Sequence, residues 1–166
     1  MIFDNLPDDP AEAAVELARR DFLVFPCDPA TKRPFLANGF HGASKKLTKV
    51  EGWFKRSISY RGALIGLVTG AVNKIAVLDI DTMEAHGNDG FASLERLTDA
   101  GFEVPSSILT VRTAGGGLHL YFACPEGGLR SRNGLAPGVD LKADGGYVIA
   151  PPSRRADGSC WQIEHA

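Results

Sequence analysis

The stretch Lys74–Asp81, with the sequence KIAVLDID, is an apolar run that ends in two carboxylates one residue apart. Such a run predicts a buried β-strand. Because side chains at positions i and i+2 of a strand lie on the same face, we expect Asp79 and Asp81 to project together and Ile80 to turn into the core. Two close carboxylates repel each other, and a hard divalent cation such as Mg²⁺ or Mn²⁺ would relieve that repulsion. The alternative is that Asp81 and Thr82 cap the next segment while Asp79 finds a surface partner.

The composition is that of an ordinary globular protein. The chain has 166 residues, of which 44% are hydrophobic and 23% are charged, enough for one domain that can comprise two packed lobes. The formal net charge of −2 gives no overall attraction to nucleic acid, so such a partner would need a local basic patch. No apolar run approaches the length of a membrane span, and Met1–Pro10 is acidic rather than signal-like. The three cysteines lie far apart without metal-ligand spacing, which favours free thiols in a reducing cytoplasm.

The hydrophobic pattern predicts a mixed arrangement of helices and strands. Asp9 is a good N-cap, because Pro10 follows at the first helical position and Glu12 can complete a capping box. A second capping-box candidate, Thr48–Glu51, opens a short helix that is expected to contain Trp53 and Phe54. A third helix is expected from about Asp89 to Ala100, with Phe91, Leu94 and Leu97 facing inward, and strands are expected at Phe22–Pro26, Ala63–Val68, Ser107–Arg112, Leu118–Ala123, Val139–Leu141, Tyr147–Ala150 and Ser159–Glu164.

A run of three glycines, Gly115–Gly117, lies between two of these expected strands. Glycines let the backbone approach a ligand closely, and consecutive N–H groups can form a nest that binds an anion. His119 shares a strand face with Gly117 and Tyr121, where its side chain could donate to a phosphate oxygen. The alternative is a hairpin turn in which the histidine is satisfied by the backbone.

Asp140 lies in a short strand, and Lys142 shares its face two residues later. Such a pair is usually a surface ion pair of little energetic consequence. Asp144-Gly145 is a strong signal for a hairpin turn, which assigns Asp144 a structural role. Asp140 stands outside any turn dipeptide and is therefore the better functional candidate.

These three segments in this order resemble a known family. A strand that ends in Asp-x-Asp is followed by a glycine-rich motif with His119, and then by Asp140 and the run Gly145–Ser153, GGYVIAPPS. This set resembles the bifunctional DNA primase/polymerase (prim-pol) domain of the archaeo-eukaryotic primase superfamily. Such domains occur in plasmid and phage replication proteins and are often fused to a helicase. The resemblance covers nearly the whole chain and includes Lys32–Pro34 and Ile65–Gly70.

The resemblance implies an α+β fold in which an N-terminal α/β lobe packs on an RRM-like, β-rich lobe, with the active site between them. Residues 1–166 would then be a single catalytic domain, the N-terminal part of a longer replication protein. Its implied activity is template-dependent nucleotidyl transfer, namely primer synthesis and DNA polymerisation. The implied partners are a single-stranded DNA template or primer, NTP or dNTP, and a fused or associated helicase, in the cytoplasm of a bacterial, archaeal or phage-infected cell.

The resemblance also implies roles for single residues. Asp79, Asp81 and Asp140 match the acids that bind two catalytic Mg²⁺ or Mn²⁺ ions, and His119 matches the histidine that contacts the nucleotide phosphates. Ala114 and Gly115 stand where relatives often carry a serine, and the zinc-binding Cys/His insertion of some relatives is absent. The other residues expected to bind the nucleotide are Gly116, Gly117, Arg112 and Lys142.

Other interpretations remain open from the residues alone. The chain could be a recruitment module that binds DNA or nucleotide with little activity of its own, or a metal-dependent nuclease or phosphohydrolase that uses the same acids. Arg112 and Lys32 could equally be exposed residues without a functional role. Basic segments that could contact a nucleic-acid backbone are Gly128–Asn133, Lys45–Lys46 and Lys55–Arg56.

Overall fold

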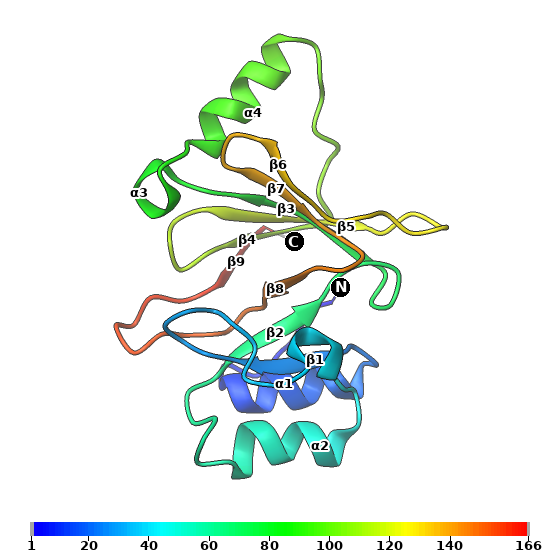
Figure 1. The fold of residues 1–166 in the computed structure, drawn as a ribbon, viewed down its shortest axis with the longest axis vertical. Coiled ribbons are helices and arrows are strands. Elements are labelled where there is room, and N and C mark those ends of the chain that lie inside the picture. The colour runs from blue at the N-terminus through cyan, green and yellow to red at the C-terminus, as the bar shows by residue number, and fades with distance from the viewer. Residues whose placement is uncertain (1, 166) are drawn as a thin grey trace. The chain divides into compact units, whose positions relative to one another are not determined.

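The computed structural model describes residues 2–165, which form two compact units with one antiparallel sheet each (Figure 1). Unit 1 consists of Met1–Val68 and Tyr147–Gln162, and unit 2 of Thr69–Gly146 and Ile163–Ala166. The expected mixture of helices and strands is confirmed. In the described part of the chain, no helix is long and apolar enough to cross a membrane.

Unit 1 begins with helix α1, Pro10–Arg19, as the capping pattern predicts. The Asp9 carboxylate accepts a hydrogen bond of 2.9 Å from the N–H of Glu12, which satisfies a donor that the first helical turn leaves free. The apolar stripe of α1 faces the core through Ala13, Ala14, Val15, Leu17 and Ala18.

The sheet of unit 1 has the order β1-β2-β8, built from Val24–Cys27, Leu64–Val68 and Tyr147–Ile149. Every residue of the central strand β2 is buried. Gly66 pairs with Phe25, and a Cβ at Gly66 would lie less than 3.0 Å from the Phe25 ring, so the core requires glycine there. After β8, the buried Ser153 hydroxyl accepts a hydrogen bond of 2.8 Å from the N–H of Ile65.

The second capping box is not formed. Helix α2 spans Leu47–Glu51, so Thr48 lies inside the helix, and no side chain caps its start at Lys46. The Ser44 hydroxyl instead accepts a hydrogen bond of 3.1 Å from the Lys46 N–H and shapes the entry to the helix. The π-helical turn η2, Gly52–Arg56, follows directly and carries the expected aromatic pair; a short 3-10 helix η1, Gly39–Gly42, lies in the preceding loop.

Unit 2 contains a six-stranded sheet of order β6-β7-β3-β5-β4-β9. Its strands are β3 (Ile75–Ile80), β4 (Leu109–Arg112), β5 (Leu118–Ala123), β6 (Arg132–Ala136), β7 (Val139–Lys142) and β9 (Gln162–His165). The four strands β7-β3-β5-β4 are antiparallel, and helices α3 (Met83–His86) and α4 (Gly90–Asp99) connect β3 to β4. This β-α-β-β order followed by a strand beside β3 agrees with the RRM-like expectation. The acidic strand is therefore central in the sheet.

Helix α4 packs through small residues, so the expected inward position of Phe91 is wrong. The Phe91 side chain is 39% exposed, whereas Gly90 and Ser93 are buried. A Cβ at Gly90 would lie less than 3.0 Å from the side chain of Ile80, and the Ser93 hydroxyl donates a hydrogen bond of 2.6 Å to the carbonyl of Pro137. A larger residue at either position would push α4 away from the sheet.

The segment Asp144–Gly145 does not close a hairpin, because β7 and β8 belong to different sheets. Asp144 is nevertheless structural, as expected. Its two carboxylate oxygens accept hydrogen bonds from the N–H groups of Ala71, at 2.7 Å, and Leu129, at 3.0 Å. The aspartate joins three loop segments of unit 2 instead of turning one strand back on another.

Candidate active site

Three of the candidate side chains lie in one row across the centre of the six-stranded sheet. Asp79 on β3 is the register partner of Asp140 on β7 and of His119 on β5. Residues directly opposite each other on neighbouring antiparallel strands point to the same face, with Cβ atoms about 4.5–5.5 Å apart. The sheet therefore brings together three residues that are 21 to 61 positions apart in the chain.

Helix α4 covers the other face of this sheet. Ile80, which packs against Gly90 at the start of α4, alternates with Asp79 along β3 and so points to the opposite side. Ile80 is buried, as the sequence predicts. The apolar face of β3 thus holds α4, and the face of Asp79 is the one that carries the polar row.

His119 is held against Asp79. Its Nε2 lies 3.4 Å from an Asp79 carboxylate oxygen, and its side chain is only 6% exposed. Its other ring nitrogen, Nδ1, is buried without a hydrogen-bond partner among the described residues. Burial, together with the charge of Asp79, raises the pKa of Tyr121, the next residue on the same face of β5. Beside the Asp79 carboxylate, this face of β5 therefore carries an imidazole with one unused nitrogen and a neutral phenol.

The Asp140 carboxylate is held by β6 and by its own strand. Lys142 Nζ lies 2.7 Å from one carboxylate oxygen, and the N–H of Gly134 donates a hydrogen bond of 2.6 Å to the other. Lys142 also donates a hydrogen bond of 2.9 Å to the side-chain oxygen of Asn133. Asp140 and Lys142 share a face, as the strand alternation predicts, whereas the contact with Asn133 depends on a strand pairing that the sequence does not reveal.

Asp81 lies one residue beyond the end of β3. Its N–H donates to the Gly138 carbonyl at 2.8 Å, and its carbonyl accepts from the Gly90 N–H at 2.9 Å, so its backbone is fixed on both sides. Within the described residues, no group of three or more His, Cys, Asp or Glu side chains is arranged to hold a metal ion. The sheet register pairs Asp79 with Asp140 and does not extend to Asp81.

The glycine run forms a tight turn between β4 and β5. The Gly116 N–H donates to the Thr113 carbonyl at 3.0 Å, so the turn itself uses one of the N–H groups proposed for an anion nest. Gly116 has φ +84°, a conformation that favours glycine. A Cβ at Gly117 would lie less than 3.0 Å from the carbonyl oxygen of Ile80, which makes glycine necessary for the turn to pack against the end of β3.

Arg112, at the end of β4, fixes this turn. Its guanidinium forms a two-point ion pair with Glu164 on β9 and donates a hydrogen bond of 2.9 Å to the Gly116 carbonyl. A planar guanidinium suits such a two-point contact with a carboxylate. In this arrangement Arg112 links the glycine turn to the edge strand β9.

Comparison with models of protein families matches residues 14–166 to Prim-Pol, described as "Bifunctional DNA primase/polymerase, N-terminal". The chain belongs to this family. The resemblance inferred from the three motifs is thereby confirmed over the length that it implied. Comparison with curated proteins gives no match.

Membership of the prim-pol family places the chain among enzymes of the nucleotidyltransferase type that act in DNA replication. The family implies DNA and nucleotides as substrates and generally uses divalent metal ions. The donors of the polar row fit such an ion, because carboxylate oxygens are the preferred ligands of Mg²⁺ and Mn²⁺. The side chains of Asp79 and Asp140 are 24% and 27% exposed, so both remain accessible.

The other basic candidates of the prim-pol domain lie in varied surroundings. Lys45 forms an ion pair with Asp21 at 2.8 Å, and the carbonyl of Lys32 accepts a hydrogen bond from Tyr147. Arg132 and Asn133, expected in a loop, belong to strand β6. The strand was missed because its residues are mostly exposed polar and small ones that carry no alternating apolar signal.

Proposed function

We propose that this domain catalyses template-dependent nucleotidyl transfer, making primers and extending DNA in plasmid- or phage-type replication. The observation that supports this most strongly is the row in which Asp79 faces Asp140 on one side and His119 on the other. Two carboxylates directly opposite each other destabilise a sheet by their repulsion. Both carboxylates are nevertheless present at the centre of the sheet, where they are accessible and lie on the face away from α4. Their presence there favours a role in binding a cation.

In this proposal Asp79 and Asp140 supply the main metal ligands, and Asp81 contributes from the residue after the strand. When bound, the Mg²⁺ or Mn²⁺ ions would activate the attacking 3′-hydroxyl and stabilise the pyrophosphate leaving group. The three carboxylates would hold and orient those ions. The geometry supports the pair Asp79–Asp140 more strongly than it supports Asp81, which lies outside the strand register.

His119 and Lys142 would act on the negative charge of the nucleotide. Each now lies beside one carboxylate of the row, His119 beside Asp79 and Lys142 beside Asp140. With those carboxylates occupied, both basic groups would be able to bind triphosphate oxygens, which is a contribution of positioning and electrostatics. Gly116 and Gly117 shape the turn next to His119, and Arg112 maintains it through the Gly116 carbonyl.

Two observations favour a second candidate, a DNA- or nucleotide-binding recruitment module with little activity alone. The described residues contain no ready three-ligand metal group, and Lys142 engages Asp140. Such a module would need a further domain, such as a fused or associated helicase, to complete an active arrangement.

Product analysis tests these functions. The wild-type domain is incubated with a primed single-stranded DNA template, labelled nucleotides and Mg²⁺ or Mn²⁺. Asp79→Asn and Asp140→Asn are measured beside it, with the control Asp99→Asn, which makes the same charge change at an exposed position of helix α4. We expect elongated products from the wild type and the control, and none from the two site variants. Shortened DNA would identify a nuclease, and DNA binding without synthesis would favour the recruitment module.

A further inference from the structure

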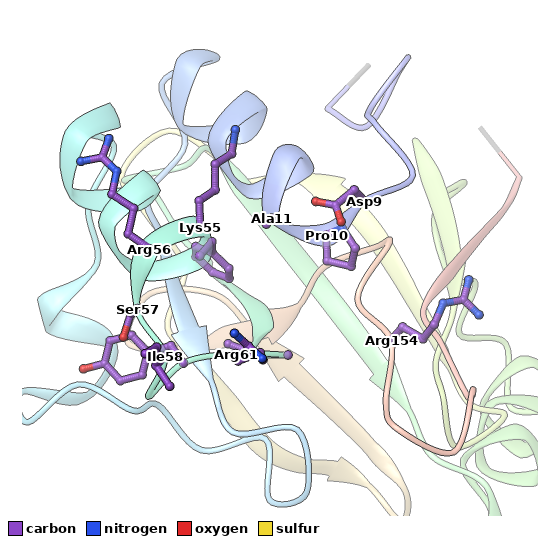
Figure 2. Close-up of a pocket in the computed structure, with 13 residues that line it drawn as sticks. Asp9, Pro10, Ala11, Lys55, Arg56, Ser57, Ile58, Arg61 and Arg154 are labelled. Carbon is purple, nitrogen blue, oxygen red and sulfur yellow. The ribbon is translucent and has the colours of Figure 1, made fainter.

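Unit 1 contains a pocket of about 280 Å³ that lies outside the polar row of unit 2 (Figure 2). It is formed where the start of α1, the turn η2 with the loop that follows it, and the segment after β8 come together. Four basic residues from these distant parts of the chain line it: Lys55, Arg56, Arg61 and Arg154. The fold thereby adds two arginines to the Lys55–Arg56 pair that the sequence marks as basic.

The four basic side chains differ in whether an acidic side chain already neutralises their charge. Lys55 pairs with Glu12, and Arg56 pairs with Glu51, each at 2.6 Å. Arg61 and Arg154 form no ion pair among the described residues, and both are exposed. The Arg154 guanidinium donates a hydrogen bond of 3.3 Å to the Gly158 carbonyl.

The other lining residues also suit a ligand that carries an anionic group next to an apolar group. The pocket includes Pro10 and Ala11 at the N-terminus of the ten-residue helix α1, the end that carries the positive side of the helix dipole. The one acidic lining residue, Asp9, uses its carboxylate to cap that helix. Ile58, which is 81% exposed, and Tyr60 present apolar surface beside the arginines.

The size of the pocket limits what it can hold. Sites for drug-sized ligands have volumes of about 300–1,000 Å³, so this pocket lies at the small end of that range. A phosphate with its sugar fits this volume better than a whole nucleoside triphosphate. Uncompensated guanidinium groups next to apolar surface are the combination with which proteins follow a single-stranded nucleic-acid backbone.

We propose that this pocket binds the sugar-phosphate backbone of single-stranded DNA, with Arg61 and Arg154 as the phosphate ligands. The choice of DNA as the partner rests on the proposed function, whereas the site itself rests on the pocket and its two unpaired arginines. The proposal gives unit 1 a template-holding role that does not depend on the metal ligands of unit 2.

The test measures binding of a fluorescein-labelled thymidine homopolymer in EDTA, over a series of salt concentrations. On single-stranded nucleic acid, each phosphate contact contributes about 0.7 to the slope of log K against log [salt], or about fivefold in affinity between 1 M and 0.1 M salt. Arg61→Ala with Arg154→Ala should therefore weaken binding about 25-fold at 0.1 M salt and reduce the slope by about 1.4. The control pair, Arg19→Ala with Arg96→Ala, removes the same charge from exposed positions outside the pocket and should change binding much less.

A second pair, Arg61→Lys with Arg154→Lys, keeps both charges and should keep the salt slope even if its affinity falls. The proposal is overturned if the alanine pair binds the homopolymer like the control pair. A second outcome also overturns it. In that outcome, inorganic phosphate raises the melting temperature of the wild type but not of the alanine pair, while both proteins bind DNA with the same affinity, so the pocket binds free phosphate and not DNA. Asp79→Asn separates the two proposals, because it should lose synthesis while binding DNA in EDTA like the wild type.

Discussion

Replacing Gly117 by alanine should damage the site through the backbone of β3. The new Cβ would lie less than 3.0 Å from the carbonyl oxygen of Ile80, a backbone atom that cannot rotate away. Ile80 lies between Asp79 and Asp81 in the chain, so a shift of its peptide group also moves the backbone of both acidic residues. The glycine turn and the acidic strand are thus mechanically coupled at this one contact.

The size of the effect follows from the overlap. Overpacking of a well-packed region by one methyl group costs roughly 1–3 kcal/mol. In a chain of this length each kcal/mol lowers the melting temperature by about 2–4 °C, so a fall of about 2–12 °C is expected. Gly52→Ala is the matched control, because no atom lies within 4 Å of its added Cβ and its backbone is helical.

Two measurements test this prediction. Circular dichroism gives the melting temperature of each variant, and primer extension is measured at a temperature at which both variants are folded. We expect Gly117→Ala to melt below Gly52→Ala and to lose most of its synthesis while still folded. If Gly117→Ala has the same melting temperature as Gly52→Ala and extends primers at the wild-type rate, the inferred steric contact with Ile80 is wrong.

Three further predictions concern other residues. Ser153→Ala should lower the free energy of unfolding in urea by about 1–3 kcal/mol, because it leaves the buried N–H of Ile65 without its acceptor; an unchanged midpoint would contradict this bond. Hydrogen bonds from Thr31 hold the pKa of Asp28 below its ordinary value of 3.8, so its contribution to stability is complete above that pH and is lost as the pH falls through the lower folded pKa. Asp28→Asn should therefore weaken the acid dependence of stability in that range, and an identical pH profile would refute it. Arg112→Lys should speed amide hydrogen exchange in β9, because one amine cannot replace the two-point contact of the guanidinium; wild-type exchange would argue against that role.

The sequence predicted the parts of the site that depend on local periodicity. The alternation in β3 correctly placed Ile80 in the core, and the alternation in β7 placed Asp140 and Lys142 on one face. It could not show that Asp79 faces Asp140, because strand pairing is set by contacts between distant segments and leaves no local pattern. The two register partners of Asp79, namely Asp140 and His119, therefore emerge only from the fold, whereas Asp81 lies outside the strand register.

The errors have the same physical origin. Asp144-Gly145 is a good hairpin signal, yet the chain there passes from one sheet to the other, and the aspartate is used to bond distant loops. Phe91 has helical spacing with its apolar neighbours, but α4 approaches the sheet through Gly90 and Ser93. In both cases tertiary packing outweighed a correct local propensity.

Manganese binding tests the central claim, that Asp79 and Asp140 hold the catalytic cation, most directly. Free Mn²⁺ is measured by electron paramagnetic resonance while the ion is titrated into the domain with a deoxynucleoside triphosphate present. Because even the loss of a residue that only supports a metal ligand typically costs about 10- to 100-fold in affinity, we predict that Asp79→Asn and Asp140→Asn each weaken Mn²⁺ binding by at least about tenfold, while Asp99→Asn binds like the wild type. Equal affinity in all four proteins would contradict the assignment of this row as the metal site.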